Sequence, residues 1–192
     1  MSGLLCSEPC STCFTLPELD VLPVPADDDL VTIAKTLGER ASGMGLSVAT
    51  AESCTGGWVA KTLTDIPGSS AWFDRGFVTY TNESKQEMLG VQAATLETCG
   101  AVSEQTVAEM ALGALNNSRG SITVAISGIA GPGGAMPGKP VGTVCFAWAV
   151  RGGDVKSCRK QFAGDRDQVR RQAVAFALNG TLERMLLHDV NG

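Results

Sequence analysis

The sequence of 192 residues contains a single histidine, His188, and a single tyrosine, Tyr80. A Ser-His-Asp triad would have to use that one imidazole, which stands near the C-terminal end. Metal sites need several histidine, cysteine or acidic ligands at characteristic spacings, and the scattered acids show none. The sequence therefore favours neither a histidine-based serine hydrolase nor a metal enzyme, and we expect no metal and no cofactor.

Long apolar runs and export signals are also missing. No run reaches the roughly 18 apolar residues that a transmembrane helix needs, and the N-terminal segment lacks the basic region of a secretory signal. Lys and Arg number 15 against 20 Asp and Glu, a net charge of -5, which argues against broad nucleic-acid or membrane-surface binding. We expect a cytoplasmic protein whose seven cysteines are reduced thiols.

The first 27 residues differ in composition from the rest. They hold four acids, no Lys or Arg, and four of the eight prolines. Cys6, Cys10 and Cys13 have a spacing that can hold an iron–sulfur cluster, as in radical S-adenosylmethionine enzymes. Such enzymes need a large barrel, for which this chain is too short. We expect residues 1–27 to form an unstructured extension with incidental cysteines, and residues 28–192 to form one domain.

Hydrophobic periodicity gives the fold class. Apolar and β-branched runs predict strands at residues 46–51, 76–81, 121–127, 141–150 and 156–163. Helix signals begin at five positions, with capping residues at the last three: Asp27, Trp58, Asn82, Ser103 and Asp165. This order predicts an α/β fold, a single-domain three-layer arrangement whose mixed sheet is covered by helices on both faces.

Three polar, glycine-flanked segments follow or join the predicted strands, where ligand clefts form. The first is residues 52–57 (ESCTGG), between a strand and a helix. Its backbone N–H groups and small hydroxyls suit a phosphate, although no Gly-Lys-Ser/Thr of a Walker loop follows. It also lacks the G-x-G-x-x-G of a dinucleotide site. The alternative is a capped helix start with glycines for tight packing.

The second segment is residues 68–70 (GSS), followed by Tyr80 and Lys85. A serine hydroxyl needs a base to become a nucleophile, and without a histidine that base would be lysine or tyrosine. A lysine can serve when burial or neighbouring charge lowers its pKa. The alternative for Lys85 is a solvated side chain on a helix.

The third segment is the glycine-rich loop that begins at Ser127. Its glycines permit close approach of the backbone to a ligand, and the alternative is a long surface loop. Arg166 opens the last predicted helix, where a guanidinium can fork onto a phosphate or carboxylate. Its alternative is a surface ion pair with Asp165 or Asp167.

Seven motifs in chain order resemble one family, the nicotinamide-nucleotide amidohydrolases, which share the C-terminal domain of the competence/damage-inducible protein CinA. The motifs are residues 51–57 (AESCTGG), 67–70 (PGSS), 76–80 (GFVTY), 100–103 (GAVS), 127–132 (SGIAGP), 139–144 (KPVGTV) and 164–166 (GDR). The resemblance covers about residues 28–188 and is typical of the stand-alone form. It implies that the chain hydrolyses nicotinamide mononucleotide to nicotinate mononucleotide and ammonia in pyridine nucleotide salvage, and that it is a homo-oligomer.

The resemblance also implies site residues. It matches the catalytic serine to Ser70, with Tyr80 and Lys85 as its companions. Arg166 matches a functional arginine, and Ser127 stands where some members have Thr. Ser53 is a rival nucleophile, with Lys61 eight residues on. We expect the substrate to be bound by Ser53, Thr55, Gly56, Ser127 and Arg166.

Two other functions remain open. One is a non-catalytic nucleotide-binding or regulatory module linked to competence or DNA damage, which could keep the glycine loops and lose the serine–lysine pair. The other is a different small amidase without phosphate-binding groups. Ser70, Tyr80 and Lys85 favour an enzyme, with nicotinamide mononucleotide as its small-molecule partner.

Overall fold

The computed structural model describes residues 23–190, with side chains through Leu187. Cys6, Cys10, Cys13 and the side chain of His188 lie outside the described residues, so the predictions made for them stay predictions. Within the described range no helix is long and apolar enough to cross a membrane.

A five-stranded sheet in the order β2-β1-β3-β4-β5 organises the fold. β1 pairs in parallel with both β2 and β3, whereas β3–β4 and β4–β5 are antiparallel. The strands are β1 (Val48–Glu52), β2 (Phe73–Val78), β3 (Ile122–Gly128), β4 (Thr143–Val150) and β5 (Val155–Gln161). The sheet is mixed, as the sequence predicts.

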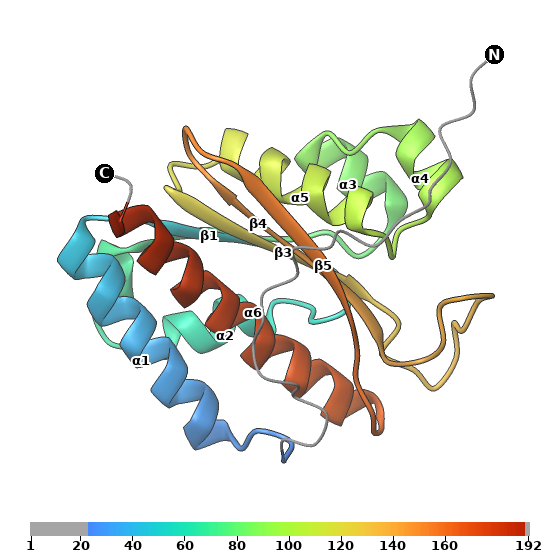
Figure 1. Cartoon of the computed structure of the whole chain (residues 1–192), viewed down its shortest axis with the longest axis horizontal. Helices are drawn as coiled ribbons and strands as arrows, with labels where there is room; N and C mark the ends of the chain where they lie inside the picture. The colour runs from blue at the N-terminus through green and yellow to red at the C-terminus, as the bar shows by residue number, and fades with distance from the viewer. Residues whose placement is uncertain (1–22, 191–192) are drawn as a thin grey trace.

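Helices cover both faces of this sheet (Figure 1). One face carries α1 (Asp27–Met44), α2 (Trp58–Thr64) and α6 (Arg166–Val190), and the other carries α3 (Asn82–Leu89), α4 (Ala93–Cys99) and α5 (Glu104–Asn116). A single 3-10 turn, η1 (Ser69–Ala71), precedes β2. The predicted three-layer α/β architecture is confirmed.

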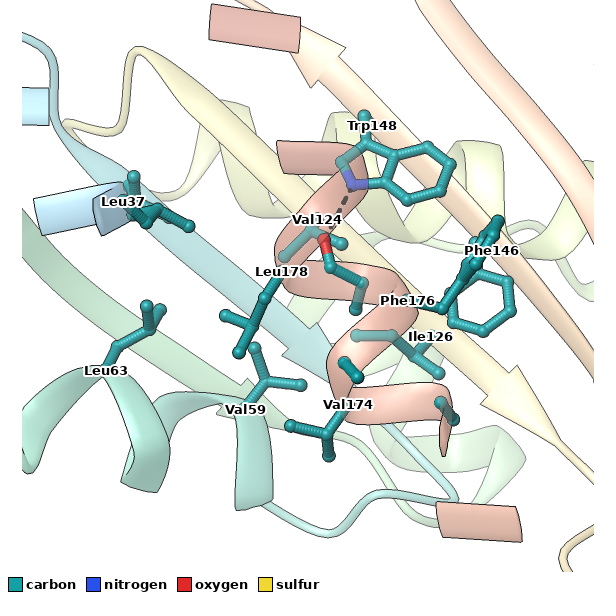
Figure 2. Packing of buried hydrophobic residues seen from close by; sticks show 14 of the residues in the cluster. Leu37, Val59, Leu63, Val124, Ile126, Phe146, Trp148, Val174, Phe176 and Leu178 are labelled. Atoms are coloured by element: carbon teal, nitrogen blue, oxygen red, sulfur yellow. Dashed lines mark hydrogen bonds between the residues drawn. The ribbon is translucent and has the colours of Figure 1, made fainter. Parts of the chain in front are cut away.

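The larger core cluster lies between the sheet and the α1–α2–α6 layer (Figure 2). Phe146 and Trp148 of β4 pack around Phe176 of α6, with ring centroids 4.7 and 5.9 Å away. The indole of Trp148 also donates a hydrogen bond to the carbonyl of Ala177, at 3.2 Å. These contacts fix α6 across the sheet.

Local sequence signals set most element ends. The Asp165–Gln168 capping box opens α6 as predicted, and Ser103 caps α5 through the N–H of Thr106. The predicted cap of α3 is wrong by one residue, because the hydroxyl of Thr81, not Asn82, accepts the N–H of Ser84.

One strand prediction is also corrected, and one helix has no counterpart among the predicted elements. The strand expected at residues 76–81 is β2 at Phe73–Val78, because Thr81 already begins the next helix while Trp72 accepts a hydrogen bond from the N–H of Val48. Helix α4 was not predicted from the sequence.

A glycine sets the distance between α3 and α5. A β-carbon added at Gly113 of α5 would lie 1.9 Å from the carbonyl oxygen of Leu89, the last residue of α3. Backbone cannot move away as a flexible side chain can, so only glycine allows this approach. The position of α3, which carries Lys85, therefore depends on Gly113.

Replacing this glycine tests that dependence. Gly113→Ala should lower the free energy of unfolding by about 1–3 kcal/mol, because the added methyl group overpacks the contact. Gly43→Ala in α1 is the matched control: nothing lies within 4 Å of the added carbon, and alanine should raise stability by about 0.5–1 kcal/mol. Urea unfolding measures both, and an equal effect of the two changes would contradict the assignment.

Candidate active site

Loops from β1, β2 and β3 meet at one edge of the sheet. These three strands are parallel, so their carboxyl ends lie together, and β4 begins at this same edge, where Gly128 pairs with Val144. Ser53, Thr79 and Ser127 stand at the three strand ends. The structure thus brings the first and third glycine-flanked segments to one place.

The central contact joins Ser53 and Lys85. Lys85 Nζ lies 3.1 Å from Ser53 Oγ and 2.9 Å from the carbonyl oxygen of Thr79. The lysine is 1% exposed and the serine 9%. Burial lowers the pKa of the Lys85 amine, because an ammonium ion loses hydration there. A neutral amine beside a hydroxyl can accept its proton, so the pair has the geometry of a nucleophile and its base.

Ser70 lies at the other end of the sheet. It belongs to η1, just before β2, whereas Tyr80 and Lys85 follow that strand. A six-residue strand spans roughly 17 Å, so the structure does not bring Ser70 to the two residues predicted as its companions. An open groove of about 620 Å³ lies on this side, lined by α1, the 65–68 turn and Trp72.

The alternative pairing of Ser53 with Lys61 is not formed either. Lys61 bonds Asp65 one turn further along α2, at 2.6 Å, and its side chain is 67% exposed. The lysine beside Ser53 comes instead from a different helix, 32 residues along the chain.

Glu52 occupies the start of α2. Its carboxylate, which is fully buried, accepts hydrogen bonds from the N–H groups of Gly57 and Val59 at 3.0 Å and of Ala60 at 2.8 Å. Of these three amides, only that of Gly57 belongs to the segment 52–57 that the sequence predicts as a phosphate site. The carboxylate of Glu52 thus occupies the first N–H groups of α2, and a phosphate site on this segment stays a prediction.

Arg170 of α6 holds the other side of the same turn. Its Nε donates to the carbonyl of Cys54 at 3.0 Å and its Nη2 to that of Thr55 at 2.8 Å. The guanidinium also lies 5.1 Å from the ring centre of Trp58, at a distance typical of a cation–π contact.

Two donors of this turn remain available. Among the described residues, the N–H groups of Cys54 and Thr55 have no acceptor, while the N–H of Ser53 bonds the carbonyl of Ile126. The hydroxyl of Thr55 is buried, and within the described part of the chain it has no hydrogen-bond partner. Unused donors next to a nucleophile are the groups that can stabilise an oxyanion. Gly56, beside them, is exposed with φ +62°.

Arg166 connects Tyr80, after β2, with the glycine-rich loop. Its Nη2 donates to the hydroxyl of Tyr80 at 2.9 Å, and its Nη1 donates to the carbonyl of Gly131 at 2.8 Å. Tyr80 is 59% exposed. Arg166 therefore forms neither of the ion pairs given as its alternative, and it lies with Tyr80 at the exposed side of this edge.

Ser127 ties β3 to the chain before α5. Its hydroxyl donates to the carbonyl of Ala101 at 2.7 Å, and Lys139 donates to the neighbouring carbonyl of Cys99 at 2.7 Å. The motif at residues 100–103 thus lies against the glycine-rich loop. Ser127 keeps the capacity to accept a hydrogen bond.

Sequence reasoning gave no role to Glu52 or Arg170. A signal for Glu52 was present, since an acidic residue closes a strand that is otherwise apolar or small (VATAE). Arg170 had no such signal, because one arginine in a polar helix turn looks like a surface residue.

Comparisons with known proteins agree with this fold. The model of the CinA C-terminal domain matches residues 30–185. The nicotinamide-nucleotide amidohydrolase PncC of Escherichia coli strain K12 is 54% identical over 160 residues, 83% of this chain and 97% of that protein. The protein of the same name from Pseudomonas putida is 49% identical over 156 residues, 81% and 97% of the two chains.

Solved structures lead to the same family. The competence/damage inducible protein CihA from Agrobacterium tumefaciens superposes with a TM-score of 0.79 at 46% identity, covering 85% of this chain and 98% of that one. A CinA superfamily protein from Klebsiella pneumoniae gives 0.79 at 39% identity, covering 82% and 98%.

The burial of Lys85 predicts a pH dependence of stability. Because the pKa of its amine is lower in the folded chain, the unfolded chain binds more protons between the two pKa values, and the free energy of unfolding rises with pH across that interval. Lys85→Met removes this titration. Urea unfolding from about pH 7 to about pH 10 should show the parent gaining stability relative to the variant, and a constant difference would contradict the lowered pKa.

Proposed function

The chain belongs to the CinA C-terminal domain family and is an enzyme of the amidohydrolase type, and we propose that it hydrolyses nicotinamide mononucleotide to nicotinate mononucleotide and ammonia. The observation that carries the proposal is the 3.1 Å contact between Ser53 and the buried Lys85, in a chain about half identical to proteins named for this reaction. The product would re-enter NAD synthesis. A cytoplasmic location and a homo-oligomeric state stay predictions.

We assign the nucleophile to Ser53, in the role that the resemblance gave to Ser70. The neutral amine of Lys85 takes the proton of Ser53 as Oγ attacks the carboxamide carbon. The carbonyl oxygen becomes an oxyanion, which the N–H groups of Cys54 and Thr55 stabilise. The lysine ammonium then gives its proton to the leaving amine, and ammonia departs from an acyl-serine.

Hydrolysis of the acyl-serine uses the same base. Lys85 removes a proton from water as the water oxygen attacks the ester carbon, and returns that proton to Ser53 Oγ when the acid leaves. The carbonyl of Thr79 holds the amine in place through both steps, since it accepts one of its N–H groups at 2.9 Å.

The substrate phosphate would be bound by side chains. Arg166 is exposed and donates a hydrogen bond to Tyr80. Its guanidinium can bind a phosphate with two N–H groups. Tyr80 orients Arg166, and the hydroxyls of Thr55 and Ser127 remain for the nucleoside part. Thr55, Gly56 and Ser127 keep the binding roles expected from the sequence.

The two serines are separated by single substitutions. Ser53→Ala should lower the kcat for ammonia release from nicotinamide mononucleotide by about 1,000-fold or more, as loss of a nucleophile does. Ser70→Ala should leave this kcat close to the parent value, because β2 separates Ser70 from Lys85. Retained ammonia release by Ser53→Ala, or its loss in Ser70→Ala alone, would overturn the assignment. Free nicotinamide serves as the substrate control.

The role of Arg166 is tested with a substrate that lacks the phosphate. Arg166→Ala should raise the KM for nicotinamide mononucleotide by about 10- to 100-fold, the value of a hydrogen bond to a charged group, and should change the KM for nicotinamide riboside far less. Tyr80→Phe keeps the guanidinium and removes the hydroxyl that orients it, so it should raise the KM for nicotinamide mononucleotide less than Arg166→Ala does. An equal rise in KM for both substrates would show that Arg166 does not bind the phosphate.

A further inference from the structure

The turn that carries Ser53 is held from two sides by opposite charges. At the end of the turn, the carboxylate of Glu52 accepts hydrogen bonds from three N–H groups, those of Gly57, Val59 and Ala60. The guanidinium of Arg170 donates to two carbonyls in its middle. One of these side chains comes from β1 and the other from α6, so the turn is fixed to both the sheet and the helical layer.

A smaller residue would be enough to cap the helix alone. Helix starts are ordinarily capped by a Ser, Thr, Asp or Asn side chain at the N-cap position, but here the N-cap is Gly57, which has no side chain and has φ 92°. The cap comes instead from five residues upstream, and both oxygens of the carboxylate are used. Burying a carboxylate costs free energy unless its oxygens accept hydrogen bonds. The oxygens of Glu52 accept them from the three backbone N–H groups and from the hydroxyl of Thr50, at 3.4 Å.

The connection to the nucleophile is direct. Glu52 and Ser53 are consecutive, so their side chains leave opposite faces of the strand end. Glu52 reaches α2 on one face, and Ser53 reaches Lys85 of α3 on the other. The N–H of Ser53 is itself bound to β3 through Ile126. Any rotation of the turn about this strand end would change the separation of Ser53 Oγ from Lys85 Nζ.

We propose that Glu52 and Arg170 are positioning residues for the reaction: together they hold the turn so that Ser53 stays against Lys85 and the N–H groups of Cys54 and Thr55 face the reacting carbonyl. Neither side chain touches Lys85 or takes part in proton transfer. This inference rests on the proposed function, in which Ser53 is the nucleophile.

The test uses a buried carboxylate elsewhere as its matched control. Asp74 lies in β2, at the end of the sheet opposite to Ser53, and its side chain is 5% exposed. Its carboxylate accepts hydrogen bonds from the main chain and the side chain of Arg119. Glu52→Gln, Arg170→Met and Asp74→Asn are compared with the parent. For each we measure thermal unfolding, the kcat and KM for nicotinamide mononucleotide, and the rate at which phenylmethanesulfonyl fluoride modifies Ser53, followed by mass spectrometry.

In Glu52→Gln, an NH₂ group replaces one of the two oxygens that accept the N–H groups at the start of α2. In Arg170→Met, the carbonyls of Cys54 and Thr55 lose their donor. Each should lower both kcat and the rate of Ser53 modification by about 10- to 100-fold, the effect of a displacement near 1 Å, with little change in KM. Asp74→Asn should lose stability while Ser53 reacts at the parent rate.

The inference is overturned if Ser53 is modified at the parent rate in a folded Glu52→Gln or Arg170→Met protein, or if Asp74→Asn slows the modification as much as they do. If Glu52→Gln does not fold, Arg170→Met decides, because Arg170 is only half-buried. A third outcome separates the two proposals. If the parent protein releases no ammonia from nicotinamide mononucleotide, but Ser53 is still modified more slowly in both variants, the proposed substrate is refuted and the positioning role is supported.

Discussion

The hydrogen bonds of the Glu52 carboxylate set the relation between β1 and α2, and the candidate site is arranged around them. They determine where the strand ends and where the helix begins. The five residues between these points have both ends fixed, so Ser53 can face α3 while Cys54 packs into the core on the α6 side. The parallel pairing of β1 with β2 and β3 then brings Thr79 and Ser127 beside this turn.

Scarcity of histidine shapes the chemistry of the site. A lysine replaces imidazole as a base only when its ammonium form is disfavoured, and burial does this for Lys85. The helix that carries Lys85, α3, also lies close against α5, because Gly113 has no side chain. Under the proposed function, the glycine that sets the position of α3 is therefore on a helix that contributes no reacting group.

Periodicity and capping signals were enough to predict the sheet, its mixed pairing and most helices, because each amphipathic segment has one way to bury its apolar face. The sequence predicts Tyr80 at a strand end and Lys85 on the next helix, and in the structure both follow β2. The resemblance to the family groups Ser70 with Tyr80 and Lys85, but Ser70 lies before β2 and the other two lie after it. Arg170 could not be predicted, since its partners are main-chain carbonyls more than a hundred residues away.

The occupied helix start has a consequence for the selectivity of the site. Free amides at a helix N-terminus bind many small anions, among them inorganic phosphate and sulfate. In this fold an internal carboxylate already fills that position and repels them. Under the proposed function, recognition of the substrate phosphate then falls to the exposed guanidinium of Arg166. In the folded chain a free phosphate ion therefore finds no unpaired N–H group at Gly57, Val59 or Ala60.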